Sequence, residues 1–236
     1  MVSVCMATRN GETFIKEQLD SILPQLTPED EIVISDDCSS DSTLTVIRSL
    51  QDPRIRLLES SSEKGITRNF EASLMASKGD FIFLADQDDV WLPEKISKMK
   101  NALMHHDLVM SDCRLVDDNL QLQSESFYDL NRSGKGLLKN LLKNSYMGCC
   151  MAFTKRVKDR VLPFPADIPM HDYWVGLVAE VYSFSVCFMP DVLVLHRRHD
   201  ANASTSGRAS RHSINEKLAH RYRMIKNLFI HKYHAG

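Results

Sequence analysis

The sequence predicts an α/β protein with a mostly parallel central sheet flanked by helices. Short apolar runs alternate with segments of helical periodicity from the first residue to about residue 112, and this alternation is typical of βαβ units. The 236 residues are 43% hydrophobic and 25% charged. That is an ordinary globular composition in a chain long enough to bury a sizeable core.

Five strands are expected in the first half, over residues 1–7, 31–35, 54–58, 80–85 and 108–111. Four helices should separate them, because apolar residues recur every three or four positions over residues 14–22, 44–50, 66–74 and 96–103. Ligands of such sheets bind beyond the carboxyl ends of the strands. The polar loops 8–11, 36–41 and 86–89 should therefore meet at one rim of the sheet.

The alternation loosens after residue 112. An irregular loop is expected over residues 116–135, a short helix over 137–142 and an apolar segment over 146–153. A helix should run from His171 through Val181, and a strand should follow over residues 185–195. We expect one domain over residues 1–205, with one half at 1–112 and the other at 113–205.

Residues 206–236 are expected to form a mobile segment, which begins near residue 200, and a basic amphipathic C-terminal helix. Residues 196–236 contain nine Lys or Arg and two acids, which gives this segment a net charge of +7. The whole chain has a net charge of −2, so the rest of it carries −9. This tail indicates an anionic partner. Its helix either attaches to an anionic membrane, or packs its apolar face on the main domain or on a second copy in a homodimer. That face is formed by Ile214, Leu218, Tyr222, Ile225 and Phe229.

Several classes of function are disfavoured. The charge balance does not favour a nucleic-acid partner, and no apolar run approaches the length of a membrane span. No G-x-G-x-x-G follows the first strand and no G-x-x-x-x-G-K-[ST] occurs, which excludes a dinucleotide oxidoreductase. The six cysteines include no C-x-x-C pair, so we expect buried thiols in a reducing cytoplasm rather than structural zinc.

The most informative segment is Asp86-Gln87-Asp88-Asp89, which follows an apolar run. Three carboxylates within four residues repel one another and lose hydration at the end of a buried strand. A divalent cation relieves both effects, since carboxylate oxygens are ligands of Mg²⁺ and Mn²⁺. The pattern predicts a metal–diphosphate site with Asp86 and Asp88 as ligands. The alternative is a solvated acidic turn that caps the helix after Pro93.

Six segments, taken together in their order and spacing, resemble glycosyltransferase family 2, which has the GT-A nucleotide-sugar-binding fold. They are residues 4–11, 32–41, 65–69, 84–91, 171–174 and 197–199, and the resemblance covers roughly residues 1–205. Residues 86–91 look most like bacterial surface-polysaccharide enzymes of the rhamnosyltransferase-like branch. The resemblance implies an inverting hexosyltransferase that uses Mg²⁺ or Mn²⁺ and a UDP- or dTDP-linked donor. Its acceptor would be a hydroxyl of a glycan or a polyprenyl-diphosphate-linked saccharide, in O-antigen, capsule or related polysaccharide synthesis.

The resemblance also implies roles for individual residues. Asp172 matches the general base that deprotonates the acceptor hydroxyl, and capping of its own helix is its alternative role. Metal ligands are implied at Asp86, Asp88 and His199. Contacts with the donor nucleotide are implied at Thr8, Arg9, Asn10, Glu12, Asp36, Asp37, Arg68, Asn69, Asp86, Gln87 and Arg198. Acceptor contacts are implied at Trp91, Gly148, His171, Tyr173 and Trp174.

Two other functions stay open. A nucleotidyltransferase shares a similar sheet and metal site, but it usually has a Gly-rich basic phosphate loop after its first strand, where this chain has Thr8-Arg9-Asn10-Gly11-Glu12. A non-catalytic nucleotide-sugar-binding module would not need Asp172 beside a complete metal site. We expect a cytoplasmic enzyme that associates peripherally with the inner face of the cytoplasmic membrane.

Overall fold

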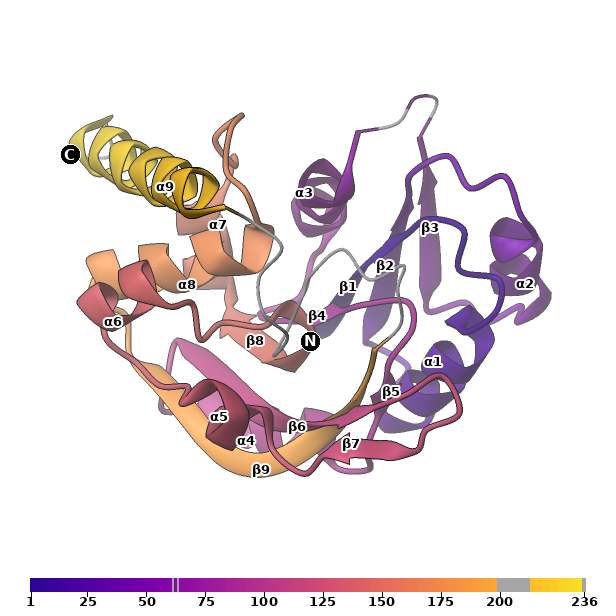
Figure 1. The fold of residues 1–236 in the computed structure, drawn as a ribbon. Helices are drawn as coiled ribbons and strands as arrows, with labels where there is room; N and C mark the ends of the chain where they lie inside the picture. Colours follow the sequence, from indigo (N-terminus) through magenta and orange to yellow (C-terminus); the bar gives the residue numbers. More distant parts are fainter. Residues whose placement is uncertain (61, 63, 199–212, 235–236) are drawn as a thin grey trace.

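The computed structural model describes residues 1–60, 62, 64–198 and 213–234. Its strands are β1 (Val2–Thr8), β2 (Glu31–Asp36), β3 (Ile55–Glu59), β4 (Phe81–Ala85), β5 (Val90–Trp91), β6 (Leu108–Val116), β7 (Leu122–Ser124), β8 (Met151–Thr154) and β9 (Val186–Arg197). They form one sheet in the order β3-β2-β1-β4-β8-β6-β9-β5, with β7 paired to β6. Figure 1 shows that β6 and β9 curve strongly, so the sheet curls at this end.

The first half of the sheet is parallel, as predicted: β1 lies between β2 and β4, and β3 follows β2 at the edge. Strands β1 and β2 are buried along nearly their whole length. A parallel strand covered on both faces needs a continuous apolar run, which is why these strands were recognisable from the sequence.

The second half of the sheet is mixed. Strand β8 runs antiparallel between β4 and β6, while β9 lies parallel beside β6 and carries the two-residue strand β5 at the edge. The sheet is therefore continuous across residue 112, which lies inside β6. The end of β9 and the loop after β4 come together through β5.

The α-helices are α1 (Ile15–Ile22), α2 (Thr43–Ser49), α3 (Ile66–Ala76), α4 (Lys95–Leu103), α5 (Phe127–Asn131), α6 (Leu137–Leu142), α7 (Lys155–Val161), α8 (His171–Val181) and α9 (Ile214–His234). Helix α3 packs on β1 and β2, α4 packs on β6 and β8, and α1 contacts α2. In Figure 1, α3 lies on one side of the parallel strands and the pair α1 and α2 on the other. The predicted α/β class is confirmed.

Two segments contain more regular structure than expected. The predicted irregular loop at 116–135 includes β7 and α5, and the Ser126 hydroxyl caps α5 by accepting a hydrogen bond from the Asp129 amide at 3.0 Å. The apolar segment 146–153 contains a 3₁₀ turn (Gly148–Cys150) followed by β8. The segment that was predicted to be mobile falls, for residues 200–212, outside the described residues.

Helix α9 packs on α8, but not through the apolar face that the packing alternative named. Met224 is fully buried, Leu228 is nearly so, and the ring of His231 meets the edge of Trp174 at a centroid distance of 5.3 Å. The predicted apolar face points to solvent instead. Its members Leu218, Tyr222, Ile225 and Phe229, together with Tyr233, are all exposed.

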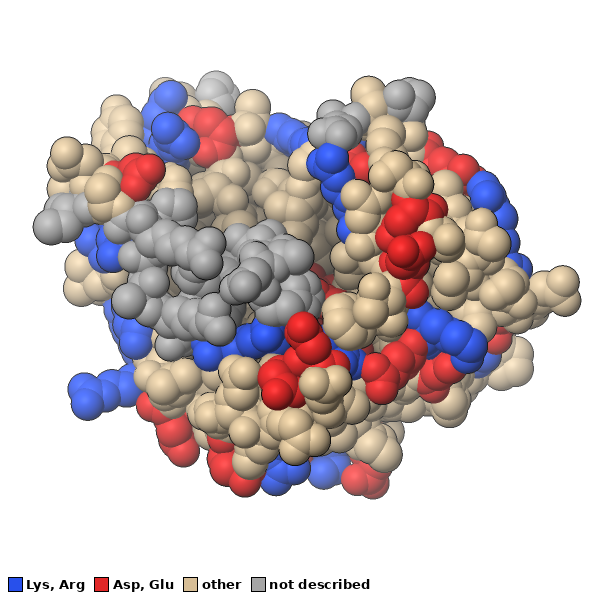
Figure 2. Space-filling view, turned by 45° about the vertical axis from the view of Figure 1, so that its right-hand side comes forward, with Lys and Arg blue, Asp and Glu red and all other residues tan. Residues whose placement is uncertain are grey.

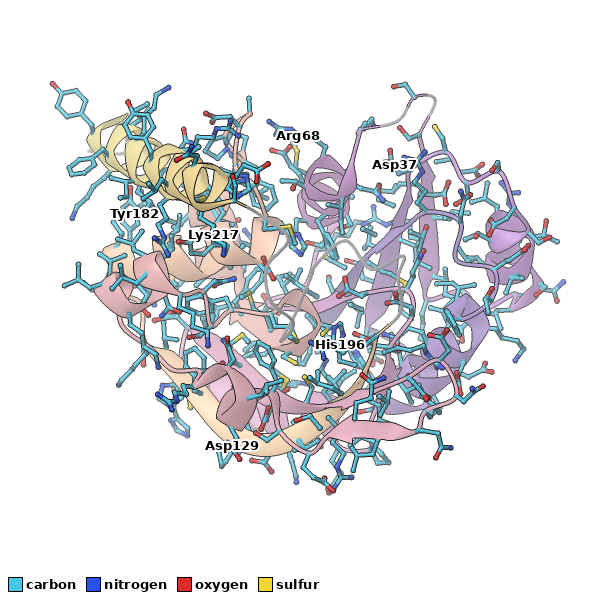
Figure 3. All side chains as sticks on the ribbon, in the orientation of Figure 1. Asp37, Arg68, Asp129, Tyr182, His196 and Lys217 are labelled. Atoms are coloured by element: carbon cyan, nitrogen blue, oxygen red, sulfur yellow. The ribbon has the colours of Figure 1, made fainter. Side chains whose placement is uncertain are left out.

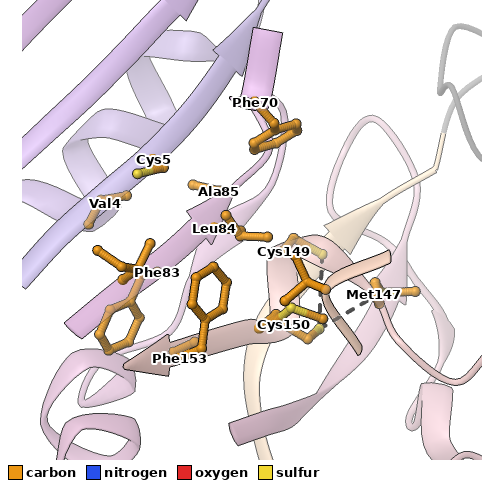
Figure 4. Packing of buried hydrophobic residues seen from close by; sticks show 14 of the residues in the cluster. Val4, Cys5, Phe70, Phe83, Leu84, Ala85, Met147, Cys149, Cys150 and Phe153 are labelled. Carbon is orange, nitrogen blue, oxygen red and sulfur yellow. Dashed lines mark hydrogen bonds between the residues drawn. The ribbon is translucent and has the colours of Figure 1, made fainter. Parts of the chain in front are cut away.

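The core lies between the sheet and its helices and includes a group of sulfur atoms at its centre (Figure 4). The Cys149 and Cys150 sulfurs are 3.9 Å apart, and the Cys150 sulfur lies 3.8 Å from that of Met147. All six cysteines are free thiols, as expected.

The surface view in Figure 2 shows acidic and basic side chains interspersed on one face, without one sign of charge dominating it. None of the helices among the described residues is long and apolar enough to cross a membrane.

Candidate active site

Two of the predicted donor loops are bound to each other at the ends of β1 and β2. The Asn10 side chain accepts a hydrogen bond from the Ser40 amide at 2.9 Å, and the Glu12 carboxylate accepts one from the Ser42 amide at 2.8 Å. The Thr8 hydroxyl donates to Asp36 at 3.0 Å. Four of the residues predicted to contact the donor nucleotide therefore fix the shape of this rim.

Asp36 and Asp37 are both buried, and their carboxylates hold backbone amides. Asp36 accepts from the amide and the hydroxyl of Ser39 at 2.8 and 2.6 Å. Asp37 accepts from the amides of Lys64 and Gly65 at 2.7 and 2.9 Å, immediately before α3. A carboxylate offers about four acceptor positions, so both groups retain capacity for a ligand.

Gln87 joins the acidic loop to the first donor loop. Its side-chain oxygen accepts from the Arg9 amide at 2.9 Å, and its amide nitrogen donates to the Arg9 carbonyl at 3.0 Å. Gly11 makes room for this side chain, because a Cβ at that position would lie 2.4 Å from Gln87 Oε1. The three loops expected at one rim are thus physically connected.

Arg68 and Asn69 lie on α3 and differ in orientation. Asn69 is buried and donates from Nδ2 to the Thr8 carbonyl at 3.2 Å. Arg68 pairs with Glu71 and donates to the Phe164 carbonyl at 3.0 Å. In Figure 3, Arg68 lies at the outer side of α3, away from His196. Asn69 therefore belongs to the rim, while Arg68 bridges α3 to the segment before α8.

Two neighbouring residues near the end of β9, His196 and Arg197, hold the acidic loop, and His196 was not among the predicted site residues. Asp89 is fully buried, and its Oδ1 lies 2.9 Å from His196 Nδ1 and accepts from the Arg197 amide at 3.0 Å. The Arg197 side chain is also buried and donates from Nε to the Asp88 carbonyl at 2.8 Å. The last residues of β9 therefore fix the positions of Asp88 and Asp89.

Asp89 and His196 strongly shift each other's pKa because both side chains are buried. Burial by itself would lower the pKa of His196, but the Asp89 carboxylate outweighs it and raises that pKa to about 9. Burial would raise the pKa of Asp89, yet the charge of His196 and the hydrogen bonds from His196 and the Arg197 amide hold it below its usual value. The pair is thus an imidazolium and a carboxylate at neutral pH.

The pKa of Asp86, unlike that of Asp89, lies above its usual value. Burial raises its pKa well above the ordinary value, and the carboxylates of Asp89, Asp88 and Asp172 raise it further. One cluster among the described residues has the spacing of metal ligands: Asp86, Asp89, Cys149 and His196 each offer one atom within 4.8 Å of the others. The predicted ligand His199 lies outside the described residues. Arg198 donates its amide to the Val116 carbonyl at 2.9 Å.

Asp172 enters the site from the first turn of α8. Its Oδ2 accepts from the Gly148 amide at 3.0 Å and its Oδ1 from the Tyr173 amide at 2.6 Å. Burial nevertheless raises the pKa of this carboxyl to about 6. Gly148, whose amide binds Asp172, directly precedes Cys149, and the Cys149 sulfur lies within 4.8 Å of an oxygen of Asp86. The 3₁₀ turn therefore links Asp172 to the acidic loop.

His171 is a packing residue in this structure. Its ring stacks on Phe70 at a centroid distance of 3.8 Å, and burial lowers its pKa to about 3, so the imidazole is neutral. A Cβ on Gly148 would lie 3.0 Å from His171 Nε2. Gly148 therefore allows the close approach that brings its amide to Asp172.

The three aromatic residues predicted to contact the acceptor are mainly buried. Trp174 is fully buried and donates to the Val161 carbonyl at 3.0 Å. Trp91 is 2% exposed, with the Lys95 amino group 3.8 Å from its ring centre. Tyr173 is 9% exposed. These side chains shape the core behind the site, and Trp174 and Trp91 offer no free surface to a ligand.

Comparison with known proteins agrees with this geometry. The model of the family Glycosyl transferase family 2 matches residues 3–162. A dTDP-rhamnosyl transferase of Shigella flexneri, RfbG, is 30% identical over 224 residues, which cover 84% of this chain and 72% of the relative. The chain belongs to glycosyl transferase family 2.

Other relatives and structures extend the comparison. An Escherichia coli β-1,3-glucosyltransferase named for UDP-Glc and GlcNAc-diphosphoundecaprenol, WfgD, is 27% identical over 182 residues, or 75% of this chain and 68% of the relative. S. aureus TarS in complex with UDP-GlcNAc superposes with a TM-score of 0.74 at 18% identity, over 98% of this chain and 66% of that chain. A mannosyltransferase of Pyrobaculum calidifontis, in complex with GDP-Man and Mn²⁺, has a TM-score of 0.65 at 20% identity, over 87% of this chain and 58% of that chain. The chain thus spans 66% of the TarS segment 1–349, and these likenesses show the GT-A fold.

Proposed function

We propose that this glycosyltransferase is metal-dependent and inverting, and that it moves a hexose from a UDP- or dTDP-linked donor to a hydroxyl of a glycan or lipid-linked saccharide. The observation that carries the proposal is that Asp172 on α8 binds the Gly148 amide, while the next residue, Cys149, clusters with Asp86 and Asp89 of the loop that follows β4. A base for the acceptor thereby stands beside a site for the donor diphosphate. The names of the relatives in E. coli and S. flexneri support this donor class, and the E. coli name also supports a lipid-linked acceptor.

The residues at the acidic loop fit a divalent cation. The pKa of Asp86 is raised by burial and by three neighbouring carboxylates, and one oxygen of Asp89 is buried with no hydrogen-bond partner among the described residues. A bound cation would favour the charged form of Asp86 and would give the open Asp89 oxygen a partner. Asp86 and Asp88 would hold Mg²⁺ or Mn²⁺, which when bound neutralises charge on the departing diphosphate.

Asp172 would act as the general base. The acceptor hydroxyl gives its proton to the carboxylate while its oxygen forms a bond to the anomeric carbon. The bond from that carbon to the diphosphate breaks, and the nucleoside diphosphate leaves with the electron pair. Attack from the side opposite the leaving group inverts the anomeric carbon. A pKa of about 6 suits this task, because the ideal base has a pKa near the working pH.

The nucleoside would bind where the loops 8–12 and 36–41 are bound together. Asp36 and Asp37 stay the proposed contacts with ribose and base, since a carboxylate accepts from a ribose hydroxyl or from a pyrimidine N3–H. Asn69 and Gln87 would support this pocket through Thr8 and Arg9, to which they are hydrogen-bonded.

The exposed face of α9 would hold the enzyme at an anionic membrane, where a polyprenyl-diphosphate-linked acceptor is displayed. Leu218, Tyr222, Ile225, Phe229 and Tyr233 are spaced by four, three, four and four residues, which places them on one helical face. Exposed basic side chains accompany them at Arg223, Lys226 and Lys232. An apolar face with flanking cations fits an anionic lipid surface.

The test of the proposed function is a donor panel with purified protein and a lipid-linked saccharide acceptor. UDP-, dTDP-, GDP- and ADP-linked hexoses are supplied with Mn²⁺ or with chelator, and release of the nucleoside diphosphate is followed. We expect turnover of a pyrimidine donor only with the metal. Preference for a purine donor would overturn the assignment of Asp36 and Asp37, and transfer of a nucleotidyl group would overturn the proposed reaction.

A further inference from the structure

Beside the proposed site for a hard cation lies a set of ligands with different chemistry. The sulfur of Cys149 lies 3.6 Å from His196 Nδ1, and both side chains are buried. Together with one oxygen each from Asp86 and Asp89, they form a group within 4.8 Å. Mg²⁺ and Mn²⁺ prefer oxygen ligands, whereas a thiolate and an imidazole select softer ions such as Zn²⁺.

The distances are close to those of a tetrahedral zinc site. Zinc binds sulfur at about 2.3 Å and imidazole nitrogen at about 2.0–2.1 Å, which gives an edge of about 3.5 Å between the two ligand atoms. The observed separation of 3.6 Å between Cys149 Sγ and His196 Nδ1 meets this value. On binding, the 2.9 Å contact between His196 Nδ1 and Asp89 Oδ1 would be replaced by bonds from His196 Nδ1 and from the other Asp89 oxygen to the metal.

A second observation points to a missing ligand. Asp89 is fully buried, and its Oδ2 has no hydrogen-bond partner among the described residues. Buried carboxylate oxygens are normally satisfied, because leaving one unpaired costs free energy. A cation bound by Asp89 would satisfy this atom.

We propose that Cys149, His196, Asp89 and Asp86 form a binding site for Zn²⁺ that is distinct in ligand type from the site of the hard cation. On binding, the Cys149 thiol and the His196 imidazolium each lose a proton to solvent, and so does the Asp86 carboxyl where it is protonated. The thiolate, the neutral imidazole nitrogen and the carboxylates then bind the metal. The two sites share Asp86, so Zn²⁺ excludes the hard cation from its ligand. If the proposed function holds, Zn²⁺ therefore inhibits transfer by competing with Mn²⁺.

The binding test uses Co²⁺ as a spectroscopic substitute for Zn²⁺. Purified full-length protein is titrated with Co²⁺ and then with Zn²⁺, while the thiolate-to-cobalt charge-transfer band and the visible bands of tetrahedral cobalt are recorded. We expect one equivalent of cobalt to give both bands and Zn²⁺ to displace it. This measurement does not depend on any activity of the protein.

The variants are Cys149→Ser and Cys149→Ala, with Cys187→Ser as the matched control at a half-buried cysteine. Both Cys149 variants should lose the charge-transfer band and bind Zn²⁺ about 10-fold more weakly or worse, and the control should match the wild type. If the Cys149→Ser variant is destabilised, the Cys149→Ala variant is used in its place. Absence of the band in the wild type, or equal binding by the Cys149 variants and the control, would overturn the site.

An activity measurement separates the two proposals. If the protein transfers sugar and Zn²⁺ inhibits it, raising Mn²⁺ should relieve the inhibition, and Cys149→Ser should require more Zn²⁺ for half-inhibition relative to its own uninhibited rate. A cobalt band without sugar transfer would contradict the proposed function alone. Sugar transfer without a cobalt band would contradict the zinc site alone.

Discussion

Asp89 Oδ1 lies 2.9 Å from His196 Nδ1, and this buried contact joins the acidic loop after β4 to the C-terminal end of β9, the longest of the described strands. The two residues are separated by 107 positions in the sequence. Arg197, next to His196, also binds the backbone of Asp88. The end of β9 therefore positions Asp88, which we propose as a metal ligand.

Breaking this pair should destabilise the protein strongly. His196→Asn leaves the buried Asp89 carboxylate without its cation, which typically costs about 3–5 kcal/mol. Urea denaturation at pH 7 measures the free energy of unfolding. The control is Lys16→Met, which removes the exposed pair with Asp20 and should cost less than about 1 kcal/mol. Equal small losses in both variants would show that the buried pair contributes little.

The pH dependence of stability should report the same pair. The pKa of His196 is raised from about 6.5 to about 9, so its charged form is favoured in the folded state. The stability that it contributes is fully present below about pH 6.5 and is lost as the pH rises through 9. The free energy of unfolding of the wild type should fall over this window by about 3 kcal/mol. The His196→Asn variant should lack this component of the decline, and an identical pH profile would contradict the raised pKa.

Asp172→Asn should lower transfer by about 10²–10⁴-fold while donor affinity is retained, because a positioned base contributes about this much. For the wild type, kcat/KM should rise with pH through about 6, where the carboxyl loses its proton. The matched control is Asp167→Asn, which alters an exposed carboxylate on the segment before α8. Loss of donor binding with an unchanged rate for bound donor would remove Asp172 from the role of base.

Phe229→Asp should abolish salt-sensitive binding to vesicles that contain an anionic phospholipid, without lowering the melting temperature, because this side chain is 75% exposed. Met104→Asp places the same charge on another exposed apolar residue, at the end of α4, and should leave vesicle binding unchanged. Sedimentation with vesicles measures both. Binding that survives Phe229→Asp, or a dimer that replaces vesicle binding, would contradict the membrane role of α9.

The parallel half of the fold was predictable because β1, β2 and β4 are buried along nearly their whole length and therefore read as apolar runs. The short strand β5 was not, since Val90 and Trp91 are a strand only through their pairing with Leu195 and Val194 far along the chain. The face of α9 that packs on the domain was not predictable either. Its amphipathic pattern indicates two faces, but which face packs depends on Trp174 and Tyr182 of the neighbouring helix region.

The candidate site was predictable where function resides in a local string of residues. Asp86 and Asp88 were predicted from the acidic segment and Asp172 from the family resemblance, and their roles stay predictions. The structure places the Asp172 carboxylate on the Gly148 amide, next to Cys149 of the cluster with Asp86. His196 and Cys149 were missed because their significance depends on contacts between β9, the 3₁₀ turn before β8 and the acidic loop. A histidine at the end of a predicted strand, beside a basic pair, was the available signal for His196.

The most direct test of the account is calorimetric titration of the wild type and of Asp88→Ala with UDP and dTDP, each in Mn²⁺ and in chelator. We predict that Mn²⁺ strengthens binding of a pyrimidine diphosphate to the wild type and that this gain is lost in Asp88→Ala, together with most of the transfer activity. Equal affinities with Mn²⁺ and with chelator, and a wild-type rate for Asp88→Ala, would contradict a donor site built on a metal ion at the acidic loop.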